Sequence, residues 1–273
     1  MVLAVLFVIG FGWGIVGVAS ATLIAEVAGA AFGLLLVRRG LSRLGGGWPH
    51  DHLFAPDRLL ALLKVNGDIL IRTLCLMFAF AYFTARGAEM GDAVLAANAI
   101  LQHLQSIMAY GLDGFAHAVE TLVGAAIGAR DRAALRAAVR TASFWGVLTA
   151  AVFVAVYAFG GVLILRLFTE HEEVRAAARA FLPWAIVSPF LSVWPFLLDG
   201  IFIGATRTAE MRNGMLIALA LYLGAIAIFI PLWGNNGLWA AFYIFMAGRT
   251  VTLGWWYPRV ERMADRERVM ARA

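Results

Sequence analysis

A stripe of polar residues within one long apolar segment holds the groups of this sequence most able to do chemistry. Its members, spaced by three or four residues, are Gln102, Ser106, Tyr110, Asp113, His117, Glu120 and Gly124. An α-helix turns about 100° per residue, so this spacing places them along one face. An imidazole that titrates near neutral pH beside two carboxylates suits proton exchange or attraction of an organic cation. The Asp113–His117–Glu120 group is therefore the first candidate site.

The same stripe also has a structural interpretation. Polar side chains on membrane helices hydrogen-bond to neighbouring helices and hold a bundle together. Gly111 and Gly114 lie within the stripe, where a helix kink would be tolerated. The residues alone leave two interpretations open, a cavity-lining helix and an interhelical seam near the cytoplasmic end.

Charged residues in other apolar segments are further candidates. Asp68 and Arg72 lie four residues apart, which allows an ion pair on one helix face. Their position near the cytoplasmic entrance of a predicted span favours a gate or a structural clamp over a transport site. Arg249 lies deep in the last apolar segment, where a lone guanidinium needs a carboxylate or carbonyl partner. Asp199 and Glu120 are both possible partners, and the sequence does not choose between them.

Asp199 stands near the end of a segment interrupted by Pro183, Pro189 and Pro195. Prolines are expected to bend that helix and free backbone carbonyls, and discontinuous helices frame many transporter sites. Asp199 is therefore a candidate for contact with a cation. Alternatively, it is a cap or loop anchor near Arg207. Glu26, in the first apolar segment, also has no evident partner in the sequence.

Composition identifies the elements that must position these groups. Hydrophobic residues make up 62% of the chain and charged residues 14%, with a mean hydropathy of +0.83. Soluble domains have about 45–50% apolar and about 25% charged residues. A membrane helix needs about 20 apolar residues, so an all-α polytopic membrane protein with about seven spans is predicted. The expected spans are 2–37, 62–84, 93–127, 141–168, 177–204, 213–232 and 236–257.

Basic residues alternate between the loops of this predicted topology. They gather at residues 38–64, 130–140, 207–212 and 259–272. The intervening loops are mixed, acidic or uncharged, at residues 86–92, 170–173 and 233–236. Basic loops stay on the cytoplasmic side during insertion, which predicts a multi-pass inner-membrane protein with a cytoplasmic C-terminus. The net charge of +5 thus reports topology rather than nucleic-acid binding.

Enzyme and cofactor signatures are missing from the sequence. Cys75 is the single cysteine, so neither an intrachain disulfide nor a cysteine metal cluster is expected. The sequence has no zinc-type histidine pair, no phosphate-binding glycine loop and no nucleophile with a positioned base. Neither enzymatic activity nor a resident cofactor is predicted.

Two features suggest how the chain is organised. Gly45-Gly46-Gly47-Trp48-Pro49 is the one convincing linker, and Phe11-Gly12-Trp13-Gly14 is an expected break within the first apolar stretch. Met1 runs directly into apolar residues without a charged leader, so a signal peptide is not predicted. The economical explanation is that the chain is the C-terminal part of a larger protein.

Several stretches resemble the multidrug and toxic compound extrusion (MATE) transporters, especially their DNA-damage-inducible (DinF-like) branch. In the family's order they are Trp13–Ala19, Asn66–Thr73, Ala96–Asn98, Tyr110–His117, Val123–Ala129 and Leu198–Thr208. The family folds as two six-helix bundles around a central cavity. The resemblance implies a last helix region of the N-terminal bundle at 1–40, a cytoplasmic linker at 41–58, the C-terminal bundle at 59–258 and a basic tail at 259–273.

The resemblance also implies a function. Such transporters export cationic or amphipathic organic compounds by alternating access, coupled to entry of a proton or a sodium ion. The coupling carboxylate of the DinF-like branch lies on the family's first helix, which has no counterpart here, so no coupling residue is transferred. The expected partners are the substrate, the lipid bilayer and an N-terminal bundle. Two alternatives are a lipid-linked precursor flippase of the same superfamily and a non-transporting fragment or half-unit.

Overall fold

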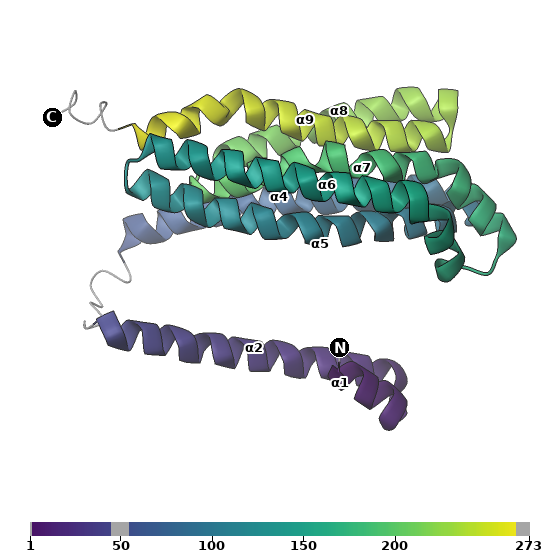
Figure 1. The fold of residues 1–273 in the computed structure, drawn as a ribbon, viewed down its shortest axis with the longest axis horizontal. Helices are drawn as coiled ribbons and strands as arrows, with labels where there is room; N and C mark the ends of the chain where they lie inside the picture. The colour runs from purple at the N-terminus through teal and green to yellow at the C-terminus, as the bar shows by residue number, and fades with distance from the viewer. Residues whose placement is uncertain (1, 45–54, 266–273) are drawn as a thin grey trace. The chain divides into compact units, whose positions relative to one another are not determined.

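The structure is a computed structural model that describes residues 2–44 and 55–265. The predicted Gly-rich linker and most of the predicted basic tail lie outside these residues. The chain divides into two units, Met1–Leu59 and Leu60–Ala273. Every described element is helical (Figure 1). The all-α fold predicted from composition is therefore confirmed for the described residues.

The first unit is a helical hairpin with one very short arm. It contains α1 (Val2–Val5), the π-helical turn η1 (Leu6–Gly10) and α2 (Gly14–Leu44). The chain reverses at the expected break, where Gly12 and Gly14 have φ angles of +68° and +53°. Such left-handed angles are readily available to glycine. After the reversal, the Trp13 backbone N–H donates to the carbonyl oxygen of Phe7 at 3.1 Å, which holds the short arm against α2.

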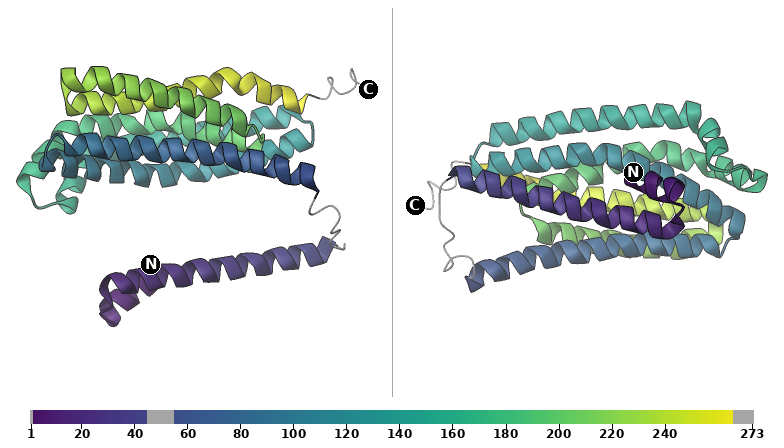
Figure 2. Two further views of the ribbon diagram at one scale, coloured as in Figure 1. Left: turned by 180° about the vertical axis from the view of Figure 1, so that it is seen from behind. Right: turned by 90° about the horizontal axis from the view of Figure 1, so that it is seen from below.

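The second unit is a bundle of long helices that run back and forth along one direction (Figures 1 and 2). Its helices are α4 (Pro56–Ala88), α5 (Asp92–Gly128), α6 (Arg132–Phe168), α7 (Glu172–Gly204), α8 (Thr208–Trp233) and α9 (Asn235–Glu261), followed by the 3₁₀ turn η2 (Arg262–Ala264). Each predicted span after the first falls within one of these helices. Turns of one to three residues join them, so neighbours in sequence are antiparallel.

Five helices are long and apolar enough to cross a membrane, within the part of the chain that the structure describes. The qualifying segments are Gly14–Ser42, Pro56–Ala88, Arg132–Phe168, Glu172–Gly204 and Thr208–Trp233. Helices α5 and α9 do not qualify, because α5 carries the polar stripe and α9 carries Arg249 and two asparagines. The predicted number of seven spans is thus not confirmed by hydropathy.

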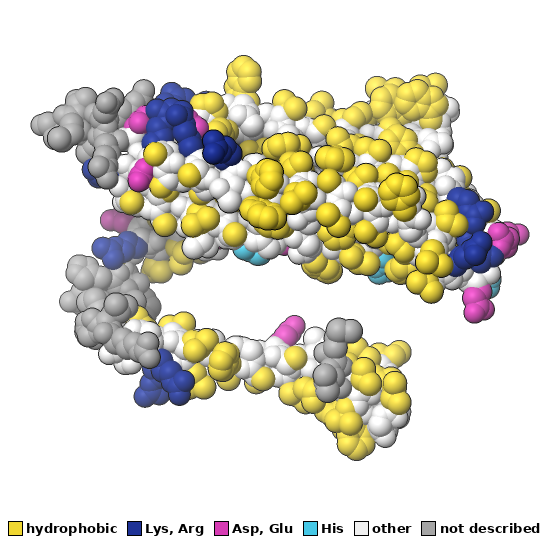
Figure 3. Space-filling model, viewed as in Figure 1, with side chains coloured by type: hydrophobic (Ala, Val, Ile, Leu, Met, Phe, Trp, Pro, Cys, Tyr) yellow, Lys and Arg dark blue, Asp and Glu magenta, His cyan; other side chains and the backbone are white. Residues whose placement is uncertain are grey.

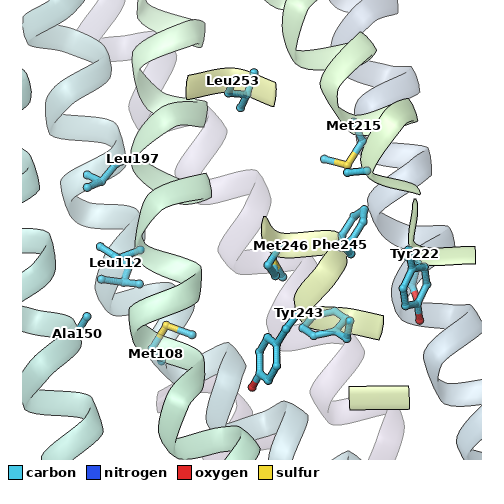
Figure 4. Packing of buried hydrophobic residues seen from close by; sticks show 14 of the residues in the cluster. Met108, Leu112, Ala150, Leu197, Met215, Tyr222, Tyr243, Phe245, Met246 and Leu253 are labelled. Carbon is cyan, nitrogen blue, oxygen red and sulfur yellow. The ribbon is translucent and has the colours of Figure 1, made fainter. Parts of the chain in front are cut away.

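One hydrophobic core runs through the second unit (Figure 4). It includes Met108 and Leu112 on α5, Leu197 on α7 and Tyr222 on α8. Three core tyrosines also donate hydrogen bonds to backbone carbonyls of other helices: Tyr157 to Leu104, Tyr222 to Ala79 and Tyr243 to Trp184. Buried phenolic hydroxyls need such partners, so these bonds fix the rotation of α6, α8 and α9 in the bundle.

Helices α5 and α7 approach each other most closely at two glycines. A Cβ atom on Gly200 would lie 2.2 Å from the carbonyl oxygen of Ala116, and one on Gly204 would lie 2.3 Å from that of Glu120. Real Cβ atoms do not make such contacts, so only glycine fits at both positions. Small residues spaced by four are the usual device for close helix packing in membranes.

Two predicted irregularities are not breaks in the structure. Helix α5 runs without interruption through Gly111, and a Cβ atom there would lie 2.8 Å from the Phe153 ring of α6. Gly111 therefore makes room for a neighbouring side chain. Helix α7 likewise continues from Glu172 to Gly204 through its three internal prolines, and the bend expected at them stays a prediction.

Candidate functional site

Two arginines from different helices meet at Asp199 inside the second unit. Its Oδ2 atom accepts hydrogen bonds from Arg72 on α4 and from Arg249 on α9, the latter at 2.7 Å. Only 3% of the Arg249 side chain is exposed. Its guanidinium also lies 5.7 Å from the centre of the Phe245 ring, a cation–π contact. We call Arg72, Asp199 and Arg249 the interior cluster. It joins three helices, and Asp199 is one of the two partners predicted for Arg249.

The predicted ion pair between Asp68 and Arg72 is wrong. Asp68 instead pairs with Arg212 of α8 and accepts a hydrogen bond of 3.2 Å from the Thr208 hydroxyl, while Arg72 pairs with Asp199. Spacing by four allows contact within a helix, but that contact competes with partners on neighbouring helices. Burial removes water from both charges at a cost, and partners on neighbouring helices with good geometry offset it. Asp68, paired with Arg212, and Asp199, paired with Arg72, therefore each join α4 to another helix.

Asp113 belongs electrostatically to the interior cluster. It is half-buried on α5 and interacts with the charges of Arg72, Asp199 and His117. The two carboxylates, Asp113 and Asp199, balance the two guanidiniums, Arg72 and Arg249. Asp113 has no hydrogen bond to any side chain among the described residues.

The polar stripe of α5 lies partly on the surface of the second unit. Tyr110 is 77% exposed and His117 is also exposed, whereas Gln102, Asp113 and Glu120 are partly buried. The contacts of the stripe's polar side chains are local to α5: Ser106 donates to the Gln102 carbonyl, and the His117 Nδ1 atom lies 3.4 Å from a Glu120 carboxylate oxygen. No stripe side chain has a hydrogen bond to another helix within residues 55–265. The interhelical seam is made instead by the glycines of α7.

A polar pocket opens at the N-terminal end of the stripe, beside Gln102 and Ser106. Its volume is about 210 Å³, and it is lined by Thr84, Leu95, Asn98, Ala99, Gln102, His103 and Ser106. Gln102 and Ser106 thus bring the stripe into a concave site between α4 and α5. Hydroxyl, amide and imidazole groups lining one pocket can orient a polar ligand by hydrogen bonds.

An amide network beside this pocket was not predicted. Asn98 and Asn235 exchange two hydrogen bonds of 2.7 and 3.0 Å, and the Trp239 indole donates to the Asn98 oxygen at 2.9 Å. A Cβ atom on Gly87 would lie 3.1 Å from the Asn98 amide nitrogen. The network closes one end of the bundle across α5 and α9. Isolated asparagines at the starts of two apolar stretches were the available signal in the sequence.

Metal and thiol chemistry find no support in the described residues. No group of three or more His, Cys, Asp or Glu side chains in residues 2–44 and 55–265 is placed to hold a metal ion. Cys75 is buried on α4 and unpaired. Glu26 is exposed on α2 and has no ion pair within the first unit's described residues.

The fold is that of a known class of helical membrane transporters. The structure superposes with a TM-score of 0.80 on the Vibrio cholerae MATE transporter VcmN in its bent form, at 20% sequence identity, over 96% of this chain and 60% of that chain. A MATE solved in complex with MaD5 gives a TM-score of 0.82 at 21% identity, over 96% and 59% of the two chains. At these identities the likeness establishes the fold alone.

The sequence itself establishes the family. Residues 69–233 match the family described as MatE, so the chain belongs to the MatE family. It is 39% identical over 253 residues to the DNA damage-inducible protein F of Escherichia coli K12, covering 93% of this chain and 55% of that protein. It is 25% identical over 250 residues to the chloroplastic Protein DETOXIFICATION 44 of Arabidopsis thaliana, covering 92% and 46%.

The chain thus spans about half the length of the curated relatives that it matches. Members of the family are transporters rather than enzymes, and several apolar helices make this chain a multi-pass membrane protein. The resemblance to the DinF-like branch predicted from sequence stretches is confirmed. The roles of the individual site residues stay predictions.

Proposed function

We propose that α4–α9 form the C-terminal bundle of an antiporter that exports cationic or amphipathic organic compounds. In this proposal α2 is the last helix of a second, N-terminal bundle, and residues 41–58 link the two. The observation that supports the proposal is the polar stripe of α5, in which Ser106, Tyr110 and His117 are exposed and no side chain hydrogen-bonds to another helix of the described second unit. A polar stripe on a membrane helix needs water or a protein partner, so a central cavity between two bundles explains it.

The proposal treats α5 and α9 as membrane spans although their hydropathy is lower. Both are at least as long as α8, at 37 and 27 residues against 26. Their polar groups do not require contact with lipid: Arg249 is paired inside the bundle, and the stripe would line the cavity. Seven helices would then cross an inner membrane, with the arginine-rich loops and the C-terminus on the cytoplasmic side.

Asp113 and Glu120 would supply the negative charge that attracts a cationic substrate, and Tyr110 an aromatic face. A proton or sodium ion arriving at Asp113 would neutralise the carboxylate and so release the substrate. Neutralisation would also leave Arg72 and Arg249 with Asp199 as their single counter-charge. The interior cluster therefore supports a link between ion binding and helix position. The pair Asp68–Arg212 would act as the cytoplasmic gate or clamp.

The acidic character of the stripe also bears on the alternative of a lipid-linked precursor flippase. Such a substrate carries phosphates and needs a cationic groove. The stripe has two carboxylates and no arginine or lysine. The antiporter proposal fits this charge better.

Ethidium efflux from an efflux-deficient bacterium tests the proposal. The chain would be expressed alone and fused behind the N-terminal half of the E. coli relative. We expect export from the fusion and none from the chain alone. Asp113→Asn in the fusion should lower export at least about tenfold, whereas the exposed, distant Asp92→Asn should not. Export from the chain alone would contradict the need for a second bundle, and full export by Asp113→Asn would remove Asp113 from the site.

A further inference from the structure

A second polar site lies outside the bundle, at the N-terminal end of α6. Arg132, Arg136 and Arg140 are four residues apart and therefore lie along one ridge of the helix. They line an open pocket of about 720 Å³ together with Ala133, Ala137 and Thr141. Figure 3 shows dark blue Lys and Arg side chains gathered at this end of the second unit. None of the candidate transport residues borders the pocket.

The first two arginines are held in place by two acids at the end of the bundle. Arg132 donates to Glu261 at 3.1 Å and to Asp265 at 3.2 Å. Arg136 makes a two-pronged contact with the Glu261 carboxylate, at 3.2 and 3.0 Å. We call Arg132, Arg136, Glu261 and Asp265 the tail cluster. Its two positive and two negative charges balance, so its guanidiniums are oriented without leaving a net charge.

Arg140 is the surplus charge of this pocket. It is exposed, and it has no ion pair or hydrogen bond within residues 55–265. Thr141, the next residue, is also exposed and places a hydroxyl at the same wall of the pocket. A free guanidinium beside a hydroxyl, next to a second arginine that is already oriented, is a suitable arrangement for the oxygens of a phosphate.

The ridge of α6 changes character directly beyond Arg140. The next three positions at the same spacing are Phe144, Leu148 and Val152, which are 63%, 44% and 56% exposed. These positions follow the helix away from the arginines, and Figure 3 shows a largely hydrophobic surface on the second unit beyond its basic end. A soluble phosphate would use only the arginines. A phospholipid would use both halves of the ridge, since its headgroup and acyl chains change from charged to apolar in the same direction.

We propose that this pocket binds an anionic phospholipid, with the headgroup phosphate at Arg140 and Thr141 and an acyl chain along Phe144 and Leu148. Basic pockets at the membrane surface attract such headgroups. The bound phosphate supplies the counter-charge that Arg140 lacks. Because the tail cluster joins the start of α6 to the end of α9, the lipid sits where these two helices are joined and strengthens that joint. The proposal requires only insertion in a membrane, not transport.

Native mass spectrometry of the purified full chain in detergent tests the proposal, with phosphatidylglycerol, phosphatidylcholine or glycerol 3-phosphate added. We expect phosphatidylglycerol adducts to survive and to raise the melting temperature, while the other two do neither. Arg140→Gln should weaken phosphatidylglycerol binding about tenfold. The matched control is Arg166→Gln, an exposed arginine in the last turn of the same helix, which should leave binding unchanged.

Several outcomes would overturn the proposal. Equal phosphatidylglycerol binding by wild type and Arg140→Gln would show that Arg140 does not form a lipid site. Equal weakening by Arg166→Gln would show only a general attraction between the lipid and a basic protein. An equal effect of glycerol 3-phosphate would make it a phosphate site without a lipid. Arg140→Lys keeps the charge and tests the same point if Arg140→Gln does not fold. It should bind with intermediate strength, because an ammonium cannot contact two phosphate oxygens as a planar guanidinium does.

Discussion

The interior cluster and the tail cluster use the same chemistry in opposite surroundings. In both, two arginines contact carboxylates from other segments of the bundle. Arg249 is 3% exposed, whereas the Arg132 side chain is 39% exposed. Loss of one member of a buried ion pair destabilises the fold strongly, because the remaining charge has no water around it. Loss of one member of an exposed pair costs little stability, because water solvates the remaining charge. The comparison teaches that the interior cluster holds helices in one arrangement, while the tail cluster orients charges that can still meet a ligand.

The largest effect should come from taking the carboxylate out of the interior cluster. Asp199→Asn leaves Arg249 buried without a counter-charge, which costs about 3–5 kcal/mol of stability. Thermal and denaturant unfolding in detergent would measure this cost. Asp92→Asn, at an exposed acid of α5, is the control and should be close to neutral. An equally small effect at Asp199 would mean that its ion pairs do not stabilise the bundle.

A smaller effect should follow from moving the interior cluster without changing its charges. Gly200→Ala forces α7 away from α5, because the new Cβ atom would lie 2.2 Å from the Ala116 carbonyl oxygen. Overpacking of this kind costs about 1–3 kcal/mol and shifts the neighbouring Asp199. Gly224→Ala, on α8 with no atom within 4 Å of its new Cβ, is the matched control. If both variants unfold at the same temperature, the close contact of α5 and α7 is not required.

A substitution in the tail cluster should lower stability only slightly, and the loss should depend on the salt concentration. Arg132→Gln removes contacts to Glu261 and Asp265, and partly exposed pairs of this kind contribute about 1 kcal/mol or less. The loss should shrink as NaCl rises from low concentration to about 0.5 M, because salt screens exposed charges. The cost of Asp199→Asn should change little over that range. Equal salt dependence at the two sites would remove the distinction between the clusters.

The smallest expected effect is a pH dependence of stability caused by Glu261. Hydrogen bonds from Arg136 and Arg132 lower the pKa of Glu261 below its ordinary value of 4.5, against the opposing effect of partial burial. Its contribution is therefore present above that value and is lost as the pH falls through the lower pKa of the folded protein. We expect Glu261→Gln to be less stable than wild type at pH 7 and equal to it once wild-type Glu261 is protonated. A difference that persists below the folded pKa would contradict this.

The positions of the helices could be predicted because they depend on local composition. Each apolar stretch of α4–α9 is bounded by short polar turns, and burial in lipid or protein favours an α-helix for all of them. The break at Gly12 and Gly14 was also readable, since glycines readily adopt the left-handed backbone angles of that turn. These features do not depend on which helix becomes the neighbour of which.

The ion-pair and hydrogen-bond partners within the site depend on how the helices pack, which residue spacing along the sequence does not reveal. Asp68 and Arg72 satisfy the rule for an intrahelical pair, yet each has its partner on another helix. For Arg249 the sequence offered two acids, and the position of α7 selects Asp199. The Asn98–Asn235 bonds join residues far apart in the chain, so amide chemistry alone did not reveal them. The stripe of α5 was predicted as a face, but its exposure follows from where the other five helices lie.

The glycines at 200 and 204 also set how the bundle can move. With no side chain between them, α5 and α7 interlock backbone to backbone, and neither can slide or turn without displacing the other. We therefore expect the stripe on α5 and Asp199 on α7 to keep their separation when the bundle rearranges. Helix α4 is joined to its neighbours differently, by cross-helix hydrogen bonds of Asp68, Arg72 and the Ala79 carbonyl.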